Sequence, residues 1–290
     1  SFGNILALMV FMVGGTLILL KQFAPKSILQ SIADHKATIL PLVPTIYSFL
    51  VDLCARSNYD VSSLKYCISG GAALPRVLLN KVEETLKVSV IEGYGLTETS
   101  PVIAVNTFKD GSIPGSVGPI VPNVEVKIID ESGKEKLTGK VGEILVRGET
   151  VMKGYWNLPK ETAETITSDG WLKTGDLGHL DEKSRLFISA GRKKDLIIRA
   201  GENVSPLAIE NVLMNHPAIA EVAALGVPDE RAGERVKVCV VLRQEATATD
   251  SELKSYCQKN LPAFMTPDYF QFMKELPKTA TGKILKTDLK

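Results

Sequence analysis

The sequence predicts an α/β protein: part of a large parallel-sheet α/β domain with an appended small β-barrel, followed by a small α+β C-terminal domain. Up to residue 110, helical and strand-like segments alternate with short connections, which is typical of βαβ units. In residues 111–193, short β runs are separated by Gly, Pro and Asp, as in small sheets and barrels. Residues 194–290 mix both patterns over a length usual for an independent domain. We therefore expect a large domain at 1–193 and a small domain at 194–290.

The expected elements follow from hydrophobic periodicity and from the Gly and Pro residues that interrupt it. We expect helices at residues 4–13, 25–35, 45–57, 75–86, 206–215 and 250–260. We expect strands at residues 16–21, 39–43, 64–69, 88–93, 124–130, 142–147, 171–180, 186–189, 220–227 and 236–242. Because ligands of open α/β sheets bind beyond the carboxyl ends of parallel strands, the loops there are the first place to look for a site.

The apolar stretch at residues 5–20 is predicted to be a buried helix-to-strand unit and not a signal or membrane anchor. No basic segment precedes it, no cleavage-site pattern follows it, and it is shorter than the roughly 18 to 20 residues of a membrane span. Gly14 and Gly15 divide it into a helix-like half and a strand-like half.

The charges nearly cancel, with 34 Lys and Arg against 33 Asp and Glu. Such a chain has no global field that would recruit nucleic acid or an anionic membrane. The cysteines are far apart and form no C-x-x-C pair or metal-ligand cluster with the three histidines. We therefore expect reduced thiols in a cytoplasmic protein. The cysteines are Cys54, Cys67, Cys239 and Cys257.

Two small-residue loops carry the first chemical signals. Residues 68–75 (ISGGAALP) lie between a strand and a helix, where glycine lets a planar ligand approach the backbone closely. An ordinary tight turn is the alternative. Residues 92–101 (EGYGLTETSP) combine an aromatic ring, a hydroxyl and a carboxylate, which suit stacking on a base, holding a phosphate oxygen and binding Mg²⁺. The alternative there is a turn with a buried Tyr94.

The second segment resembles the Tyr-Gly-x-Thr-Glu signature of the adenylate-forming superfamily, which includes acyl-CoA synthetases, luciferases and peptide-synthetase adenylation domains. The resemblance extends over essentially the whole chain. Residues 154–157 (GYWN) and 170–176 (GWLKTGD) look like the next two motifs of the family. By this match Asp176 accepts hydrogen bonds from the ribose hydroxyls, whereas taken alone it would be read as the cap of a turn.

Residues 191–195 (GRKKD) and 201–204 (GENV) resemble the interdomain hinge of the family and the loop after it. By this match Arg192 contacts the ribose or α-phosphate region, Lys194 is the pivot, and Ala200-Gly201 lines the pantetheine tunnel. Taken alone, the basic run would be an exposed charged face.

Residues 277–286 (PKTATGKILK) resemble the terminal motif that carries the catalytic lysine of the family, and Lys283 matches that lysine. When a carboxylate attacks an α-phosphate, two anions meet and charge builds on the phosphoryl oxygens, so a positioned ammonium group stabilises the arrangement. Lys278 and Lys286 are rivals that the sequence does not dismiss.

The residue patterns and the resemblance together give the predicted site residues. Lys283, Glu98 and Thr97 are expected to act in catalysis, and Glu98 is also the expected Mg²⁺ ligand. The expected contacts of ATP and coenzyme A are Gly70, Gly71, Ala72, Glu92, Gly93, Tyr94, Gly95, Thr97, Asp176, Arg192, Lys194, Ala200 and Gly201.

Two features of the family do not occur in the sequence: a Ser/Thr/Gly-rich phosphate loop that ends in Lys, and an aromatic-His segment that borders the acyl pocket. Both are expected before Ser1, and residues 1–3 (SFG) look like those that follow the His segment. We therefore expect an N-terminally truncated chain that binds ATP poorly and is inactive alone.

For the intact enzyme, the resemblance implies that ATP and a carboxylic acid form an acyl-adenylate and that the acyl group then passes to coenzyme A after the smaller domain swings about Lys194. Residues 191–206 look more like those of fatty-acyl-CoA ligases than those of amino-acid adenylation domains, and residues 43–50 and 70–74 offer apolar or small side chains for a pocket. The expected substrate is a medium- or long-chain fatty acid. An enzyme that loads a carrier protein and a non-catalytic nucleotide-binding relative are the alternatives, and a homodimer is left open.

Overall fold

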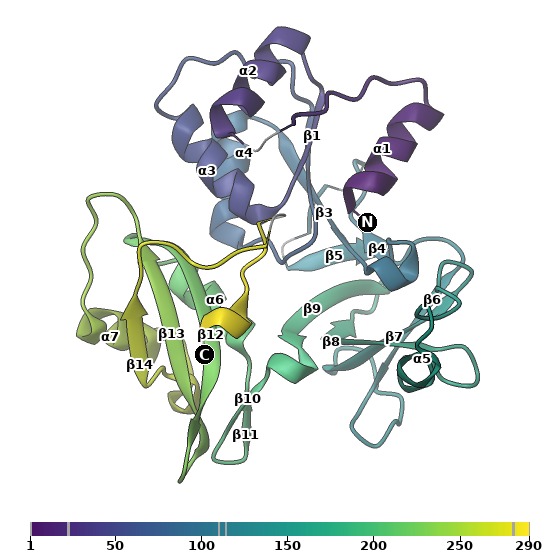
Figure 1. Cartoon of the computed structure of the whole chain (residues 1–290), viewed down its shortest axis with the longest axis vertical. Coiled ribbons are helices and arrows are strands. Elements are labelled where there is room, and N and C mark those ends of the chain that lie inside the picture. The colour runs from purple at the N-terminus through teal and green to yellow at the C-terminus, as the bar shows by residue number, and fades with distance from the viewer. Residues whose placement is uncertain (1, 22–23, 110, 114, 280–281, 290) are drawn as a thin grey trace. The chain divides into compact units, whose positions relative to one another are not determined.

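The computed structural model describes residues 2–21, 24–109, 111–113, 115–279 and 282–289, which form two compact units (Figure 1). The first unit contains Ser1–Thr174 and Gly178–Ile188, and the second contains Gly175–Leu177 and Ser189–Lys290. The expected domain boundary at Lys194 stays a prediction. Ser1 and residues 280–281 of the lysine motif, both used in the sequence analysis, lie outside the described residues.

Helices and strands of both units have the following bounds. The α-helices are α1 (Phe2–Met12), α2 (Pro25–His35), α3 (Pro44–Cys54), α4 (Arg76–Leu86), α5 (Pro159–Thr165), α6 (Pro206–Met214) and α7 (Asp250–Asn260). The strands are β1 (Ile39–Leu42), β2 (Tyr66–Ser69), β3 (Ser89–Tyr94), β4 (Ala104–Val105), β5 (Ser116–Pro119), β6 (Val124–Ile129), β7 (Gly142–Gly148), β8 (Leu172–Leu180), β9 (Arg185–Arg192), β10 (Ile197–Arg199), β11 (Glu202–Val204), β12 (Ile219–Asp229), β13 (Gly233–Leu242) and β14 (Tyr269–Phe272). Short 3₁₀ helices are η1 (Thr97–Thr99), η2 (Lys193–Asp195), η3 (Ala263–Met265) and η4 (Lys286–Leu289).

The first unit contains the parallel sheet that the sequence predicts. Strands β1, β2 and β3 pair in parallel, and the two-residue strand β4 pairs antiparallel with β3. The crossovers between the parallel strands are α3 and α4, in accord with the helical connections that parallel strands need. Helices α2, α3 and α4 gather beside this sheet (Figure 1). The predicted α/β class is confirmed.

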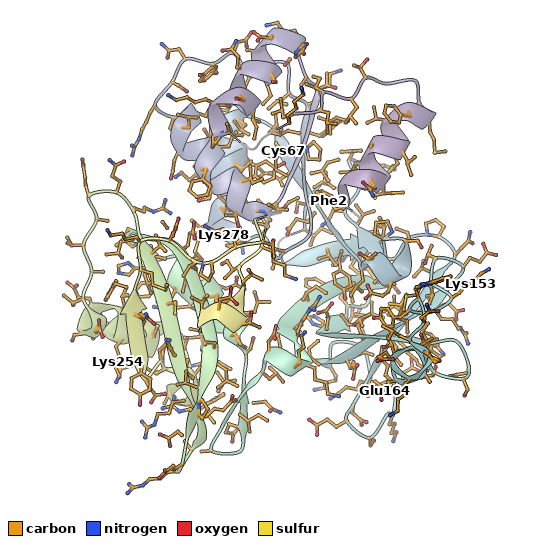
Figure 2. All side chains as sticks on the ribbon, viewed as in Figure 1. Phe2, Cys67, Lys153, Glu164, Lys254 and Lys278 are labelled. Carbon is orange, nitrogen blue, oxygen red and sulfur yellow. The ribbon has the colours of Figure 1, made fainter. Side chains whose placement is uncertain are left out.

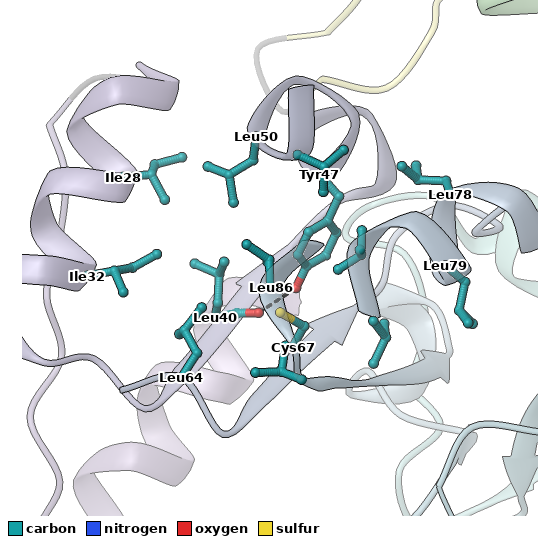
Figure 3. Packing of buried hydrophobic residues seen from close by; sticks show 14 of the residues in the cluster. Ile28, Ile32, Leu40, Tyr47, Leu50, Leu64, Cys67, Leu78, Leu79 and Leu86 are labelled. Carbon is teal, nitrogen blue, oxygen red and sulfur yellow. Dashed lines mark hydrogen bonds between the residues drawn. The ribbon is translucent and has the colours of Figure 1, made fainter. Parts of the chain in front are cut away.

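Tyr47 of α3 lies at the centre of the core of this sheet. Its side chain has no solvent exposure, and its hydroxyl donates a 2.5 Å hydrogen bond to the carbonyl oxygen of Leu40 in β1 (Figure 3). The buried Cys67 of β2 lies beside the same hydroxyl (Figure 3). A polar group is therefore buried together with its partner, as the energetics of buried hydroxyls require.

The β-rich part of the first unit is a five-stranded sheet in the order β5-β9-β8-β7-β6. Strand β5 pairs antiparallel with β9, and β6 pairs antiparallel with β7. A small antiparallel sheet or barrel is what the sequence predicts for this region. Its apolar core consists of Ile103, Ala104, Val124, Ile128, Ile144, Val146 and Leu186.

The second unit is built on the long hairpin of β12 and β13, whose register runs from Ile219↔Leu242 to Asp229↔Gly233. Because side chains alternate along a strand, the hairpin buries two faces. One face packs against α6 and α7 through Ile209 and Leu253, among others. The other face packs against the C-terminal segment through Leu276 and Leu289. Strand β14 adds to β13 in parallel.

The prediction for residues 5–20 is wrong in two respects. Residues 16–21 form no strand, and none of the side chains of α1 is buried. A strand needs a neighbour for its backbone hydrogen bonds, and within the described residues nothing pairs with this segment. The helix-like half, in contrast, is the helix α1. No helix in the described ranges combines the length and the apolar character that crossing a membrane requires.

The Tyr47 hydroxyl offers a direct test of this core. We expect Tyr47→Phe to lower the free energy of unfolding of the first unit by about 1–2 kcal/mol, because the buried carbonyl of Leu40 loses its donor. Urea unfolding followed by tryptophan fluorescence measures this, since both tryptophans, Trp156 and Trp171, belong to the first unit.

Tyr59→Phe is the control, because Tyr59 is half-buried and its hydroxyl bonds to no residue that the structure describes. An equal loss in both variants would show that the Tyr47 hydroxyl contributes nothing particular.

Candidate active site

Two of the predicted loops begin side by side at the carboxyl ends of β2 and β3. Ser69, the last residue of β2, is the register partner of Glu92 in β3. The chain therefore enters the Gly70-Gly71-Ala72 loop directly beside the segment that continues through Gly93 and Tyr94. This is the edge at which ligands of parallel sheets bind. The structure brings these two loops together, and their roles stay predictions.

Gly70 makes a close contact that depends on its having no side chain. A Cβ there would lie 2.8 Å from the ring of Phe2 in α1, and Figure 2 labels Phe2 at the start of that helix. Gly71 has a φ of 82°, a conformation that glycine adopts without steric cost. At Gly70, the close approach that the sequence predicted is thus made by an aromatic side chain of the protein itself.

Gly95 is required by the fold of the signature loop. A Cβ at this position would lie 1.6 Å from the carbonyl oxygen of Pro101. The loop returns so closely because Thr99, which is fully buried, accepts a 3.1 Å hydrogen bond from the backbone N–H of Leu96. The same turn leaves Thr97 exposed at its surface, whereas Tyr94 is half-buried.

Glu98 is held by residues in and near the GYWN motif at 154–157. The hydroxyl of Tyr155 donates a 2.9 Å hydrogen bond to Glu98 Oε1, and the backbone N–H of Met152 donates to the Glu98 carbonyl at 2.8 Å. Burial, and then the Glu98 carboxylate, raise the pKa of Tyr155, so this hydroxyl keeps its proton as a donor. The GYWN motif therefore orients the carboxylate of the signature loop. Tyr155 was quoted in that motif but not predicted as a site residue.

The Glu98 carboxylate is a suitable ligand for Mg²⁺. Magnesium is commonly bound by one or two carboxylates together with substrate phosphates and waters. A hydrogen bond to Oε1 leaves a carboxylate a second oxygen for a cation. Across the described part of the chain, no group of three or more His, Cys, Asp and Glu side chains could hold a metal ion without such substrate ligands.

Glu92 has an unusual environment for an acid. Burial raises its pKa to about 7, and a hydrogen bond from the backbone N–H of Leu74 works against that rise. The Leu74 contact joins Glu92 to the end of the loop that begins at Gly70. Glu92 therefore contacts the end of the first loop, and its proton is lost near neutral pH.

In the second unit, four predicted residues come together. Asp176 is 7% exposed, and its Oδ1 lies 3.5 Å from Nε of Arg192. Lys283 lies close enough to both for electrostatic interaction: burial and then Arg192 lower the pKa of Lys283, while Asp176 and Asp195 raise it. Lys194 also lowers the pKa of Lys283. The buried Asp176, the exposed Asp195 and three cations thus form one polar cluster.

The rival lysines of the terminal motif are both engaged. Lys278 forms a 2.7 Å salt bridge with Glu221, and Lys286 forms a 2.6 Å salt bridge with Glu210. Among the described residues, Lys283 has no salt-bridge partner. Neither glutamate was predicted, because each lies more than fifty residues from its lysine and carries no local signal.

Ala200 and Gly201 form the two-residue turn between β10 and β11. Their φ angles are 50° and 85°, which is the pattern of a type I′ hairpin turn. Ala200 also donates a 2.7 Å hydrogen bond from its backbone N–H to the carbonyl oxygen of Ala232. The predicted coenzyme A contacts are therefore the tip of a hairpin in the second unit.

Two family models match the chain. The AMP-binding enzyme model matches residues 1–156, and the model of the AMP-binding enzyme C-terminal domain matches residues 208–283.

Curated relatives include a long-chain-fatty-acid–CoA ligase of Bacillus subtilis, 44% identical over 95% of this chain and 49% of the relative. A sulfoacetate–CoA ligase of Cupriavidus necator is 36% identical over 95% of this chain and 54% of the relative. The chain thus spans about half the length of the curated relatives it matches.

Solved structures agree with the fold. ATP-bound MatB from Rhodopseudomonas palustris is 35% identical, with a TM-score of 0.88 over 95% of this chain and 54% of that one. The amide bond synthetase McbA from Marinactinospora thermotolerans is 33% identical, with a TM-score of 0.90 over 100% of this chain and 60% of that one.

The raised pKa of Glu92 predicts a pH-dependent stability. At low pH the carboxyl is protonated in both the folded and the unfolded state, so burial costs little. As the pH rises from 4.5, the ordinary value, to about 7, the unfolded state loses its proton first and the folded state is progressively destabilised. We expect Glu92→Gln to remove this loss, so that its advantage over the wild type grows by about 2 kcal/mol between about pH 5.5 and pH 8.

Urea unfolding of the first unit, followed by tryptophan fluorescence at the two pH values, measures the difference. Glu84→Gln is the control, because Glu84 is exposed. A pH-independent difference between Glu92→Gln and the wild type would contradict the assignment.

Proposed function

Because this chain belongs to the family of AMP-binding enzymes, we propose that the protein is an AMP-forming acid–thiol ligase that joins a fatty acid to coenzyme A through an acyl-adenylate. The observation that carries the proposal is the cluster of Asp176, Arg192 and Lys283 in the second unit. A buried acid beside cations suits a nucleotide, which presents ribose hydroxyls next to an anionic α-phosphate.

In the first step, a carboxylate oxygen of the acid attacks the α-phosphorus of ATP. The new O–P bond forms as the bond to the bridging oxygen breaks, and pyrophosphate leaves with that oxygen. Negative charge builds on the α-phosphoryl oxygens, so the ammonium group of Lys283 stabilises the transition state more than the separated reactants. Burial makes this charge more effective because water screens it less.

The other members of the cluster hold the nucleotide. Asp176 accepts hydrogen bonds from the ribose hydroxyls, which only an ionised acid does at both oxygens. Arg192 pairs with Asp176 and offers N–H donors to the α-phosphate. Lys194 is the proposed pivot at which the smaller domain, proposed to begin there, rotates between the two steps.

The first unit supplies the remaining proposed contacts. Tyr94 stacks on the base, Thr97 donates its hydroxyl to a phosphate oxygen, and Glu98, oriented by Tyr155, is the ligand for Mg²⁺. When bound, Mg²⁺ neutralises part of the charge of the triphosphate. The loop of Gly70-Gly71-Ala72 and the Glu92-Gly93 segment form the floor beside the base.

In the second step, the sulfur of coenzyme A attacks the acyl carbonyl carbon, the thiol proton is lost, and AMP leaves with its phosphate oxygen. The hairpin tip of Ala200-Gly201 is the proposed guide for the pantetheine arm. Its backbone is narrow because both residues are small. No side-chain nucleophile is needed, since the adenylate is already activated.

A fatty acid is the favoured substrate because the Bacillus subtilis relative is a long-chain-fatty-acid–CoA ligase at 44% identity. Another relative is a sulfoacetate–CoA ligase, so a small polar acid is the alternative substrate. Two of the apolar side chains in residues 43–50, those of Tyr47 and Leu50, are buried in the core of the first unit and do not line a pocket. The acid specificity therefore has to be measured with a series from acetate to palmitate.

Pyrophosphate exchange into ATP tests the first step, using the longest natural form of the protein that carries this sequence. We expect Lys283→Ala to reduce the exchange by roughly a hundredfold or more, the effect of removing one preorganised electrostatic group. Transfer from a supplied acyl-adenylate to coenzyme A should be unchanged, because Lys283 is not proposed to act there. Equal exchange in the variant and the wild type would remove Lys283 from the adenylation step, and no exchange in the wild type would favour a non-catalytic nucleotide-binding relative.

The acceptor is tested in a separate assay with the acyl-adenylate formed in place. We expect coenzyme A to consume it, with the acyl-CoA detected by mass spectrometry. The structural similarity to an amide bond synthetase makes an amine a necessary comparison, and a pantetheinylated carrier protein is the third. Preferential consumption by the amine or by the carrier protein would overturn the thiol assignment to coenzyme A.

A further inference from the structure

The segment that carries Lys283 contains three lysines within nine residues, and it is attached to the second unit at both ends. Lys278 lies five residues before Lys283 and Lys286 lies three residues after it. Leu276 and Leu289, each nearly fully buried, anchor the segment on the hairpin of β12 and β13, against Ala223, Leu225 and Cys239. In Figure 1 the yellow C-terminal turn lies over β12.

Backbone hydrogen bonds fold this segment into a short hairpin with Lys283 on one arm. Lys278 and Ile284 form an isolated antiparallel bridge. The Thr279 N–H donates to the Lys283 carbonyl at 2.8 Å, and the Leu285 N–H donates to the Pro277 carbonyl at 2.8 Å. The Lys283 N–H donates to Thr279 Oγ1 at 3.1 Å. The backbone of Lys283 is therefore fixed relative to Thr279.

Glu221 of β12 holds the first arm of this hairpin. Its Oε1 accepts from Nζ of Lys278 at 2.7 Å, and the two side chains are only 13% and 21% exposed. The second oxygen, Oε2, is buried without a hydrogen-bond partner among the described residues. Such a carboxylate depends on its lysine, because a buried charge without a partner is costly. Figure 2 labels Lys278 on the C-terminal segment.

Glu210 of α6 holds the other end. Its carboxylate pairs with Nζ of Lys286 at 2.6 Å and accepts a 2.8 Å hydrogen bond from the backbone N–H of Ala224 in β12. One side chain thus joins a helix, a strand and the terminal segment. Its exposure is 17%, so this pair also lies mostly out of water.

Because of these two salt bridges, the three lysines differ in their charge environment. Lys278 and Lys286 are neutralised on either side of Lys283, and the ammonium group of Lys283 remains the one in this motif without a salt-bridge partner among the described residues. The hairpin register and the two flanking ion pairs together restrict where that ammonium group lies. Its electrostatic neighbours are Arg192 and Asp176.

We propose that Glu210 and Glu221 are positioning residues for the adenylation step, which hold Lys283 beside Asp176 and Arg192 by clamping the lysines that flank it. The inference rests on the proposed function of Lys283. Neither glutamate is placed in contact with substrate. Their contribution comes from geometry, because displacement of a catalytic group by about 1 Å is enough to cost roughly a hundredfold in rate.

The test uses Glu221→Gln and Glu210→Gln in the longest natural form of the protein, with both half-reactions measured. Each change removes the charge and keeps the shape of the side chain. We expect pyrophosphate exchange to fall by between about tenfold and a hundredfold, while transfer from a supplied acyl-adenylate to coenzyme A stays within about twofold of the wild type. Hydrogen exchange at the amides of Lys283 and Leu285 should become faster, because the hairpin is released.

Lys278→Met breaks the same salt bridge from the lysine side. It should likewise reduce pyrophosphate exchange and leave transfer to coenzyme A within about twofold of the wild type. Asp60→Asn is the matched control: it breaks the 2.7 Å pair with Lys36 in the first unit and should change neither half-reaction. If a glutamine variant unfolds, Lys278→Met and the hydrogen-exchange measurement still decide the question.

The outcomes separate the two claims. If Lys283→Ala leaves pyrophosphate exchange intact, the proposed role of Lys283 fails and this inference fails with it. If Lys283→Ala abolishes exchange but the glutamate variants change neither exchange nor amide protection, only the positioning inference is overturned. Equal losses in both half-reactions of the glutamate variants would assign these residues to the stability of the unit and would also overturn it.

Discussion

A buried carboxylate must be paired with a cation or keep its proton, and this constraint organises the polar parts of the structure. In the second unit, Asp176 has Arg192, Glu210 has Lys286 and Glu221 has Lys278. In the first unit, the influences on the pKa of Glu92 are burial and hydrogen bonds from the Leu74 backbone and the Ser112 side chain, with no cation among them, and this pKa rises to about 7. The acids with cations tie distant segments together, whereas Glu92 makes the stability of its sheet depend on pH.

The second unit shows how such pairs connect the fold to the proposed chemistry. The hairpin of β12 and β13 buries one face under α6 and α7 and the other under the C-terminal segment. Its strands therefore carry apolar side chains on both faces, and the few charged ones that are buried need partners. Glu221 faces the C-terminal segment in step with Ala223 and Leu225, so its partner has to come from that segment. The lysine motif is thus attached to the sheet by the salt bridge that the buried Glu221 needs.

Local signals account for the elements that were predicted well. Helix α2 has the expected bounds because Pro25 starts it and Lys36, in the left-handed region, ends it. Helix α7 begins with a capping box in which Thr249 and Glu252 exchange hydrogen bonds. Residues 16–21, in contrast, have the composition of a strand but no partner to pair with among the residues that the structure describes. Strands β10, β11 and β14 are too short for a clear period and depend on their neighbours for pairing: β10 and β14 pair with β13, and β11 pairs with β10.

The same division holds for the candidate site. The sequence by itself determined the family, the α/β class and the identity of the motif residues, because each motif is a contiguous string whose residue types the chemistry requires. Only the tertiary structure decided that Tyr155 bonds to Glu98, that Phe2 covers Gly70 and that Glu221 and Glu210 hold the lysines beside Lys283. These contacts join residues that lie 57 or more positions apart, so no local pattern encodes them. They exist because sheet register and helix packing bring complementary charges and surfaces together.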